Sequence, residues 1–394
     1  MKQALSKGMV LSAIILMDIL TGMEFDLFVP SFPELQSHFS LTPFWVEALL
    51  SVNFAGYCLS LFFVGGLADH YGRKPIILLG LATFIIGSIA CLWAPSYGVM
   101  LGGRFLQGAG VSSPSILSFL IIADAYSLKK QQSLFAILNG LFNISAGAAP
   151  VLGSYVTLYF HWQGNFTVLL LLGLLAFVMT LLFIPAYKLP EHKETLSLRG
   201  YISLFQSKPL MLLIMHIVFS FVPYWVFVGM SPLLYMESLG VSLAHFGYYQ
   251  GALALVFALG SLCFGLIVAR HDQKKMLTIS IQIYSVGLIS CVLATFMNSS
   301  SPLLITLAFL PFIIGGIIPS VILQPLCLNF MPQAKGRVSA ILQGGRLIFS
   351  ALCLQLAGYF YRGSFQSIGI LMTVFIILTV MTLFFVIKNR EIIK

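Results

Sequence analysis

Charge is what this sequence most lacks. Asp, Glu, Lys and Arg together make up 8% of its 394 residues, against roughly 25% in soluble domains. Hydrophobic residues make up 59%. A water-soluble fold has too little interior to bury that much apolar surface. The composition therefore excludes an ordinary soluble protein and indicates that lipid is the main solvent.

Cysteine is also scarce, and the motifs of nucleotide chemistry are missing. The six cysteines all fall within apolar runs and no two of them share a short motif, so neither a disulfide framework nor a zinc site is indicated. The sequence has no Gly-rich phosphate loop ending in Gly-Lys-Ser or Gly-Lys-Thr. We therefore expect no enzyme activity, no metal and no cofactor.

What the sequence does have is long apolar runs, each close to the ~20 residues that a helix needs to cross a bilayer. We mark twelve of them, at approximately 8–30, 45–66, 76–94, 99–122, 133–158, 165–187, 209–231, 246–269, 276–297, 303–327, 338–360 and 366–387. They predict an all-α membrane protein with twelve transmembrane helices in two six-helix bundles. The expected bundles are 1–187 and 209–394, joined by a cytoplasmic linker at 188–208.

The net charge of +9 follows this topology. Arg362 is placed outside, Arg104 and Arg346 lie within spans, and all other Lys and Arg fall in cytoplasmic segments, as the positive-inside rule requires. Both termini are then cytoplasmic, and no basic patch is left for nucleic acid. The expected partners are the lipid bilayer, a small-molecule substrate and protons. We expect a monomer in a bacterial inner membrane.

The connection between the second and third runs is short, charged and rich in glycine, and it reads GGLADHYGRKP from residue 65 to residue 75. It resembles the loop between helices 2 and 3 of the major facilitator superfamily, Gly-x-Leu-x-Asp-Arg-x-Gly-Arg-Lys, at Gly65, Leu67, Asp69, Gly72, Arg73 and Lys74. The resemblance implies a secondary transporter whose two bundles rock around a site near the membrane midplane.

Three further segments resemble motifs of the same superfamily. A run in span 4 resembles its Arg-x-x-Gln-Gly-x-Gly motif, at Arg104, Gln107, Gly108 and Gly110. The end of span 1 resembles the Asp-x-x-x-Pro-x-x-Pro segment of Bcr/CflA-type drug-resistance transporters, at Asp26, Pro30 and Pro33. Span 5 partly resembles the Gly-Pro-x-x-Gly-Gly motif of the antiporter branch, at Pro150 and Gly153. Plain packing by small residues is the alternative for this last segment.

Three acidic residues lie within span 1: Asp18, Glu24 and Asp26. An ionisable residue inside a span costs roughly 2.5–3.5 kcal/mol on insertion scales, so each should face a cavity and have a role. Asp18 lies about 16 Å beyond Lys7, near the midplane, and is the best candidate for the proton site. A structural carboxyl group bonded to a neighbouring helix is its alternative. On a continuous helix Asp26 can face the same cavity, whereas Glu24 points away from both and should serve the helix end or the outer vestibule.

Two arginines lie within spans. Arg104 lies about 10 Å from the outer end of span 4, level with Asp26, so we predict that these two form an ion pair. Arg346 lies about 13 Å from the cytoplasmic surface. It should meet a carboxylate of the first half or an anionic part of the substrate, because spans 7 to 12 contain no acid. His216, at similar depth, is its only ionisable neighbour there, although a lone buried His is more often hydrogen-bonded structure.

Softer candidates for the binding site are polar side chains at helical spacing, and they are Asn53, Tyr57, Asn139 and Gln343. The glycine-rich loop is also expected to work as a conformational latch. Asp69 should lie beside the positive end of the span 11 helix dipole, and Arg73 can reach Asp124 at the end of span 4. Gly65 and Gly72 would let the loop turn.

These features predict a proton-coupled exporter of drugs or metabolites that works by alternating access. The alternative is a transporter of one carboxylate-bearing metabolite, such as a siderophore or an amino acid, with Arg346 as its anchor. A non-transporting membrane receptor is the third class, and the charges inside the spans count against it.

Overall fold

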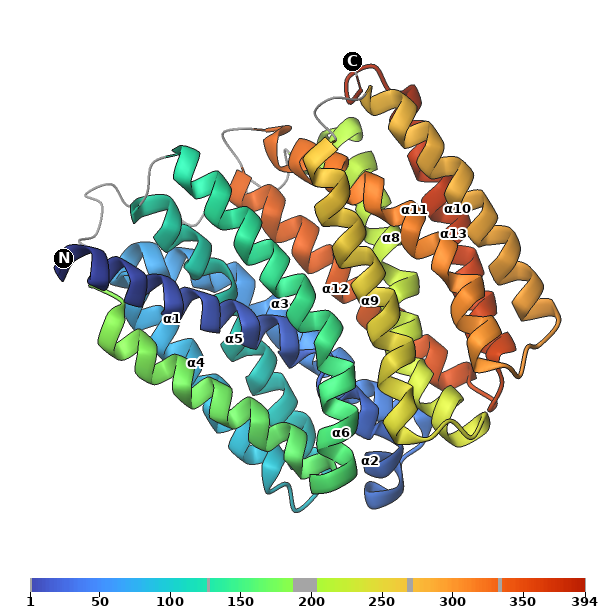
Figure 1. Ribbon diagram of the computed structural model, residues 1–394, viewed down its shortest axis with the longest axis horizontal. Coiled ribbons are helices and arrows are strands. Elements are labelled where there is room, and N and C mark those ends of the chain that lie inside the picture. Colours follow the sequence, from blue (N-terminus) through green and yellow to red (C-terminus); the bar gives the residue numbers. More distant parts are fainter. Residues whose placement is uncertain (1, 126–127, 187–203, 268–271, 332–334, 394) are drawn as a thin grey trace. The chain divides into compact units, whose positions relative to one another are not determined.

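The computed structural model describes residues 2–125, 128–186, 204–267, 272–331 and 335–393, and it is helical over most of that length (Figure 1). The chain divides into two compact units. The N-terminal unit comprises Met1–Leu41 and Ala48–Leu196, and the C-terminal unit comprises Thr42–Glu47 and Ser197–Lys394. The short segment Thr42–Glu47 therefore groups with the second unit. Most of the expected linker, 188–208, lies outside the described residues.

The N-terminal unit is formed by long helices and by two short ones that follow α1. Its elements are α1 (Lys2–Glu24), η1 (Val29–Ser31), α2 (Phe32–Phe39), most of α3 (Pro43–Tyr71), α4 (Arg73–Leu92), α5 (Tyr97–Ala125) and α6 (Leu128–Phe183). Helix α4 packs along α5, and α1 packs along α6. Gly72 separates α3 from α4 with φ 94°, a conformation that glycine adopts without steric cost.

Helix α6 contains the chain reversal that the sequence places between spans 5 and 6. Its backbone leaves helical geometry at His161, with φ 58° and ψ −174°. The Asn165 side chain donates a hydrogen bond of 2.7 Å to the hydroxyl of Thr157, whereas eight residues of straight helix would separate these positions by about 12 Å. The chain therefore turns back at His161, and α6 provides two membrane-crossing arms.

The C-terminal unit consists almost entirely of long helices. Its elements are α8 (Lys208–Pro232), the π-helical turn η2 (Leu233–Ser238), α9 (Leu243–Ile267), α10 (Gln273–Phe296), α11 (Pro302–Asn329), α12 (Lys335–Phe360) and α13 (Phe365–Lys388). Helix α8 packs against α12 and α13, and α11 packs against α9 and α10. These contacts bury aromatic side chains such as Phe227, Phe309 and Tyr284.

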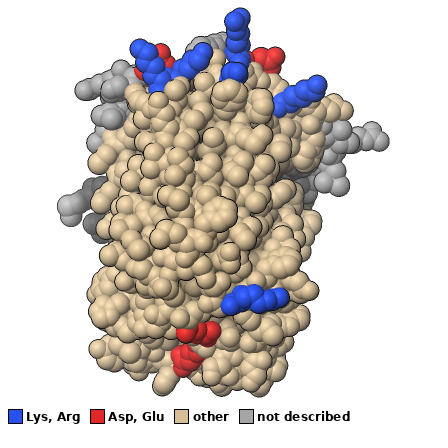
Figure 2. Space-filling model, turned by 90° about the vertical axis from the view of Figure 1, so that its right-hand side faces the viewer, with Lys and Arg blue, Asp and Glu red and all other residues tan. Residues whose placement is uncertain are grey.

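Helices of membrane-spanning length and composition account for most of the described chain. Eleven candidate spans are present, and one of them is Gly140–Phe183 in α6, which crosses twice because of its reversal. Large apolar side chains remain exposed along several helices, for example Ile289 on α10 and Ile370 on α13. On the face drawn in Figure 2, Lys, Arg, Asp and Glu lie near the two ends and a broad uncharged band lies between them. This is the expected surface of a multi-pass membrane protein.

Candidate functional site

The N-terminal unit contains an ion pair within its helical core. An Nη1–H of Arg104, near the start of α5, donates to Oε1 of Glu24, the last residue of α1, at 3.1 Å. Both side chains have 0% exposure. Because charges without water or partners are costly at this depth, a buried Arg and a buried Glu require each other.

Helix α3 supplies the polar groups that hold this pair in place. The Asn53 amide donates to Oε1 of Glu24 at 2.6 Å and to the backbone oxygen of Arg104 at 3.0 Å. The Arg104 Nε–H donates to the backbone oxygen of Leu49 at 3.3 Å. Gly108 faces the backbone oxygen of Asn53 with no room for a Cβ atom. The first glycine of the span 4 motif thus brings α5 close enough to α3 for these bonds.

The glutamine of the same motif extends the network along α5. Arg104 donates from Nη1 to Oε1 of Gln107 at 2.6 Å, which their spacing of three residues allows. The Gln107 amide in turn donates to the hydroxyl of Ser88 on α4 at 2.9 Å. On its other side the guanidinium carbon lies 3.8 Å from the centre of the Phe28 ring. The Arg-x-x-Gln spacing therefore fixes the orientation of the guanidinium group.

The network still has unused hydrogen-bonding atoms. Oε2 of Glu24, Nη2 of Arg104 and Oδ1 of Asn53 are buried and have no hydrogen-bond partner among the described residues. Buried polar atoms are usually paired, and exceptions often mark places where water, ions or ligands bind. The network can therefore bind a proton or a polar group while its existing hydrogen bonds remain in place.

The predicted pairing of Asp26 with Arg104 is wrong, because Glu24 is the partner. The prediction assumed that the first span stays helical to Pro30, but α1 ends at Glu24 and the chain continues through a turn. Directions around the helix axis, counted at 100° per residue, do not apply to residues after Glu24, because the helix ends there. Asp26 is nevertheless buried, and its Oδ1 atom has no hydrogen-bond partner in the described part of the chain.

Asp18, the predicted proton site, lies six residues before Glu24 on α1, about 9 Å away along the helix axis. Its side chain is 3% exposed. Its Oδ2 atom has no hydrogen-bond partner among the residues that the structure describes. Among the described residues no hydrogen bond from Asp18 to a neighbouring helix supports the structural alternative for this carboxyl group. Asp18, Glu24 and Asp26 are thus three buried carboxyl groups in the second half of α1 and the turn after it.

The softer candidates in this unit take different roles. Asn53 belongs to the ion-pair network, as described above. The Tyr57 hydroxyl, one turn further along α3, shares a hydrogen bond of 2.8 Å with Ser115 on α5. The side chain of Asn139 lies outside the described residues.

The antiporter-type segment of α6 packs against the end of α1. Gly153 faces the backbone oxygen of Leu27 with no room for a Cβ atom, and the Pro30 ring lies next to it. Pro150, one turn earlier, lies inside the helix, where the Ser154 hydroxyl donates to its backbone oxygen at 2.8 Å. The small residue at position 153 thus allows α6 to touch the turn that carries Asp26.

The predicted latch can be followed only in part. Gly72 ends α3 and Arg73 begins α4, while Lys74 donates to the backbone oxygen of Leu181 at 2.8 Å. Gly65 has open space around it. The side chains of Asp69 and Asp124 lie outside the described residues, so both predicted latch contacts remain predictions.

In the C-terminal unit, Arg346 and His216 have separate partners. Arg346 donates to Oε1 of Gln343 at 3.0 Å, and its guanidinium carbon lies 3.7 Å from the centre of the Phe221 ring. His216 is fully buried, and its Nδ1 atom lies 3.3 Å from the backbone oxygen of Thr379 and 3.2 Å from the hydroxyl of Thr382 on α13. These contacts favour the structural interpretation of His216.

Sequence interpretation overlooked one buried acid, Glu47. It lies in the first turns of α3, has 0% exposure, and neither of its carboxyl oxygens has a hydrogen-bond partner in the described chain. The available signal was the same as for the acids of span 1, since position 47 falls inside the apolar run predicted at 45–66. It belongs to the C-terminal unit.

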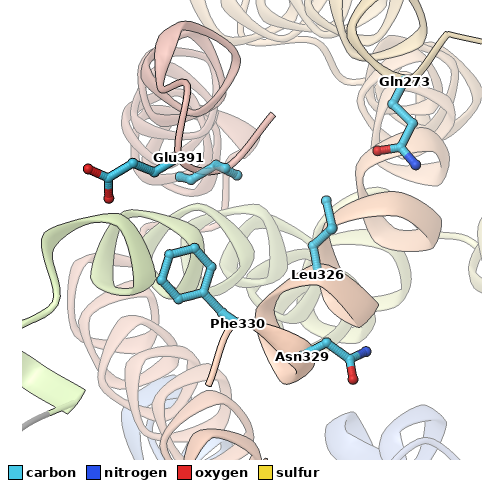
Figure 3. Close-up of a pocket in the computed structure, with 6 residues that line it drawn as sticks. Gln273, Leu326, Asn329, Phe330 and Glu391 are labelled. Carbon is cyan, nitrogen blue, oxygen red and sulfur yellow. The ribbon is translucent and has the colours of Figure 1, made fainter. Parts of the chain in front are cut away.

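A pocket with a volume of about 330 Å³ lies elsewhere in the C-terminal unit (Figure 3). Its lining comes from the start of α10, the end of α11 and the C-terminal residues, and it consists of Gln273, Leu326, Asn329, Phe330, Glu391 and Ile392. None of the residues predicted for substrate or proton binding lines it. Within the described residues, no three His, Cys, Asp or Glu side chains gather as a metal site would require.

Comparison with known proteins identifies a family and several relatives. The family model of the Major Facilitator Superfamily matches residues 14–341 and 213–393. A bicyclomycin resistance protein homologue of Haemophilus influenzae is 26% identical over 86% of this chain and 85% of that protein. The multidrug resistance protein MdtL of Escherichia coli is 29% identical over 59% of this chain and 58% of that protein.

Solved structures of transporters share the fold. A bacterial homologue of the human lysosomal transporter Spinster superposes with a TM-score of 0.75 at 15% identity, over 96% of both chains. A D-xylose–proton symporter superposes with a TM-score of 0.70 at 14% identity, over 94% of this chain and 96% of that chain. At such low identity these structures support the architecture alone.

Proposed function

Because the chain belongs to the Major Facilitator Superfamily, we propose that it is a proton-coupled secondary transporter that exports small molecules by alternating access. The relatives with drug-resistance names support export of lipophilic drugs. They favour it over transport of one carboxylate-bearing metabolite. In secondary transporters of this kind the two bundles rock around a binding site near the bilayer midplane. Transport by this movement needs no nucleotide.

The observation that carries the proposal is the buried Glu24–Arg104 pair, with unpaired carboxyl groups on either side of it. Arg104 stabilises Glu24 as a carboxylate by charge and hydrogen bonding. A proton on Glu24 would cancel that attraction and release the guanidinium Nη1–H to other acceptors. Asp18 and Asp26 can hold further protons, because neither has a basic partner among the described residues.

Exchange follows if proton and substrate compete for these carboxyl groups. A lipophilic cation entering from the cytoplasm gains most from a carboxylate that lies in apolar surroundings, where charge–charge attraction is weakly screened. It therefore displaces protons from Asp18, our candidate for the coupling site. Protons returning from the outer side displace the cation in turn. Phe28 in the turn after α1 and the aromatic side chains of α3 can receive the apolar part of such a substrate.

The membrane and orientation are part of the same proposal. We place the protein in a bacterial inner membrane as a monomer with both termini in the cytoplasm. The bacterial sources of its relatives and the distribution of Lys and Arg support this placement.

Transport by purified protein in liposomes tests the proposed function. An imposed pH gradient should drive accumulation of lipophilic cations such as tetraphenylphosphonium, and Asp18→Asn should abolish that accumulation while leaving insertion intact. Glu34→Gln is the matched control, because Glu34 is a carboxyl group of the same unit that pairs with exposed His161 at 2.9 Å. Transport indifferent to the gradient would remove proton coupling, and a response to carboxylates alone would favour the metabolite alternative.

A further inference from the structure

Glu47 is a buried carboxyl group that the proposed function does not use. It lies on α3 in the segment Thr42–Glu47, which belongs to the C-terminal unit. Its side chain has 0% exposure, and both Oε1 and Oε2 lack a hydrogen-bond partner among the described residues. An ionisable group at membrane depth is expensive to keep, and within the described chain no hydrogen bond to this one offsets the cost.

The Glu47 carboxyl group lies against Gly229 of α8 and beside the side chain of Leu354 of α12. Its Oε2 atom occupies the space beside Gly229 of α8 where a Cβ atom would lie, and Leu354 of α12 fills the same space from the other side. A turn earlier, the backbone of Phe44 approaches Gly358 of α12 so closely that a Cβ atom there would lie 2.9 Å from the Phe44 Cα atom. Two glycines thus allow the start of α3 to lie directly against both helices.

No charge on the neighbouring helices compensates Glu47. On α8 the titratable groups nearest to Gly229 along the chain are Tyr224 and His216. On α12 those nearest to Leu354 are the buried thiol of Cys353 and the exposed Tyr359. Arg346 lies further along α12, and Tyr361 directly follows its end. Arg346 is eight residues from Leu354, about 12 Å along the helix, and it bonds to Gln343 instead. Tyr361 bonds to Ser238 at 2.8 Å. His216 bonds to residues of α13, and none of these groups forms a hydrogen bond or ion pair with Glu47.

A carboxyl group in such surroundings fits only in its neutral form. The charged form would carry a full negative charge against a glycine Cα and a leucine side chain, with neither water nor a counter-ion. Burial of the neutral acid costs far less free energy than burial of the charged form. Its O–H group remains a donor that can reach a backbone oxygen after a small rotation of the side chain. Loss of the proton must therefore drive the side chain, and with it the start of α3, away from α8 and α12.

We propose that Glu47 is a proton-binding site that fastens the outer end of α3 to α8 and α12 when it holds a proton and releases it when the proton is lost. The ligand is a single proton. The site goes beyond the proposed function, since it does not depend on Asp18, Glu24 or Arg104. Asn53, which holds the ion-pair network, lies about 120° around α3 from Glu47, so the two sites use different faces of the helix.

Distances between spin labels within the C-terminal unit test the proposal without any transport assay. Trp45 and Tyr359 are 47% and 63% exposed, so Trp45→Cys and Tyr359→Cys can carry labels at the ends of α3 and α12. With the exposed Cys263 replaced by Ser, so that only these two positions take a label, the distance should lengthen from acidic to alkaline pH. Glu47→Gln, which imitates the neutral acid, should keep the short distance at every pH. Gly229→Ala, which occupies the place of Oε2, should give the long distance even at acidic pH.

Glu237→Gln is the control for this experiment. Glu237 is an exposed carboxyl group of η2 in the same unit, and its replacement should leave the pH response of the label distance as it was. A response that persists in Glu47→Gln overturns the proposal, and so does a distance that is constant with pH in the unsubstituted protein. Because the readout is a distance, failure of this site and failure of proton-coupled transport can be told apart.

Discussion

Arg104 shows how a single residue can organise contacts among several helices. Its guanidinium group contacts Glu24 at the end of α1, the Leu49 backbone on α3 and Gln107 on its own helix. A lysine at this position would provide one point charge in place of several N–H donors in a fixed plane. The motif arginine is therefore explained by geometry as well as by charge.

Removal of Arg104 alone should destabilise the protein strongly. Arg104→Met leaves the Glu24 carboxylate buried without a counter-ion, which costs about 3–5 kcal/mol in comparable buried pairs. The double variant Glu24→Gln/Arg104→Met should recover much of that loss, because no charge remains to be compensated. Unfolding of the single and double variants in detergent measures the difference. A double variant no more stable than Arg104→Met would contradict the pairing.

His216 is also a buried titratable side chain, but we expect its role to be structural. His216→Asn can keep a hydrogen bond to the Thr379 backbone or the Thr382 hydroxyl, so transport and its pH profile should be unchanged. His216→Leu should lower stability by about 0.5–1.5 kcal/mol, because it removes the hydrogen bond of His216 to α13. A shifted pH profile in His216→Asn, measured in liposomes, would make His216 a proton carrier after all.

At the scale of elements, hydropathy predicted the spans well because a bilayer leaves a chain few choices. Every backbone group must be bonded within its own helix, so an apolar run of sufficient length becomes a span. Helix ends are set by local geometry instead. The sequence does not show that α1 stops at Glu24 or that His161 alone reverses α6. These two local features decided which acid meets Arg104 and where span 5 ends.

The glycines of the helices differ in whether a neighbouring segment packs closely against them. Gly153→Ala should destabilise the protein by about 1–3 kcal/mol, because its methyl group meets the Leu27 backbone oxygen and forces α6 off the end of α1. Gly102→Ala on α5 is the matched control, since nothing lies within 4 Å of its Cβ position. It should gain about 0.5–1 kcal/mol from lower chain entropy. Thermal unfolding in detergent gives both values, and equal effects would refute the close contact at Gly153.

At the scale of the whole molecule, the acids buried in spans are distributed unevenly. Asp18, Glu24 and Asp26 lie in the N-terminal unit and Glu47 lies at the start of α3, whereas the described spans from α9 to α13 contain none. This uneven distribution could be predicted from the sequence, although the prediction overlooked Glu47. The partner of each acid was not visible, since it depends on which helices meet.

The central claim is that substrate and protons exchange at the carboxyl groups of α1. The most direct measurement is proton release from purified protein in weakly buffered detergent when a lipophilic cation such as tetraphenylphosphonium is added, followed with a pH indicator. We predict release that saturates with the cation, disappears in Asp18→Asn/Glu24→Gln and persists in Glu34→Gln. Cation binding without proton release, or release undiminished in the double variant, would contradict the claim.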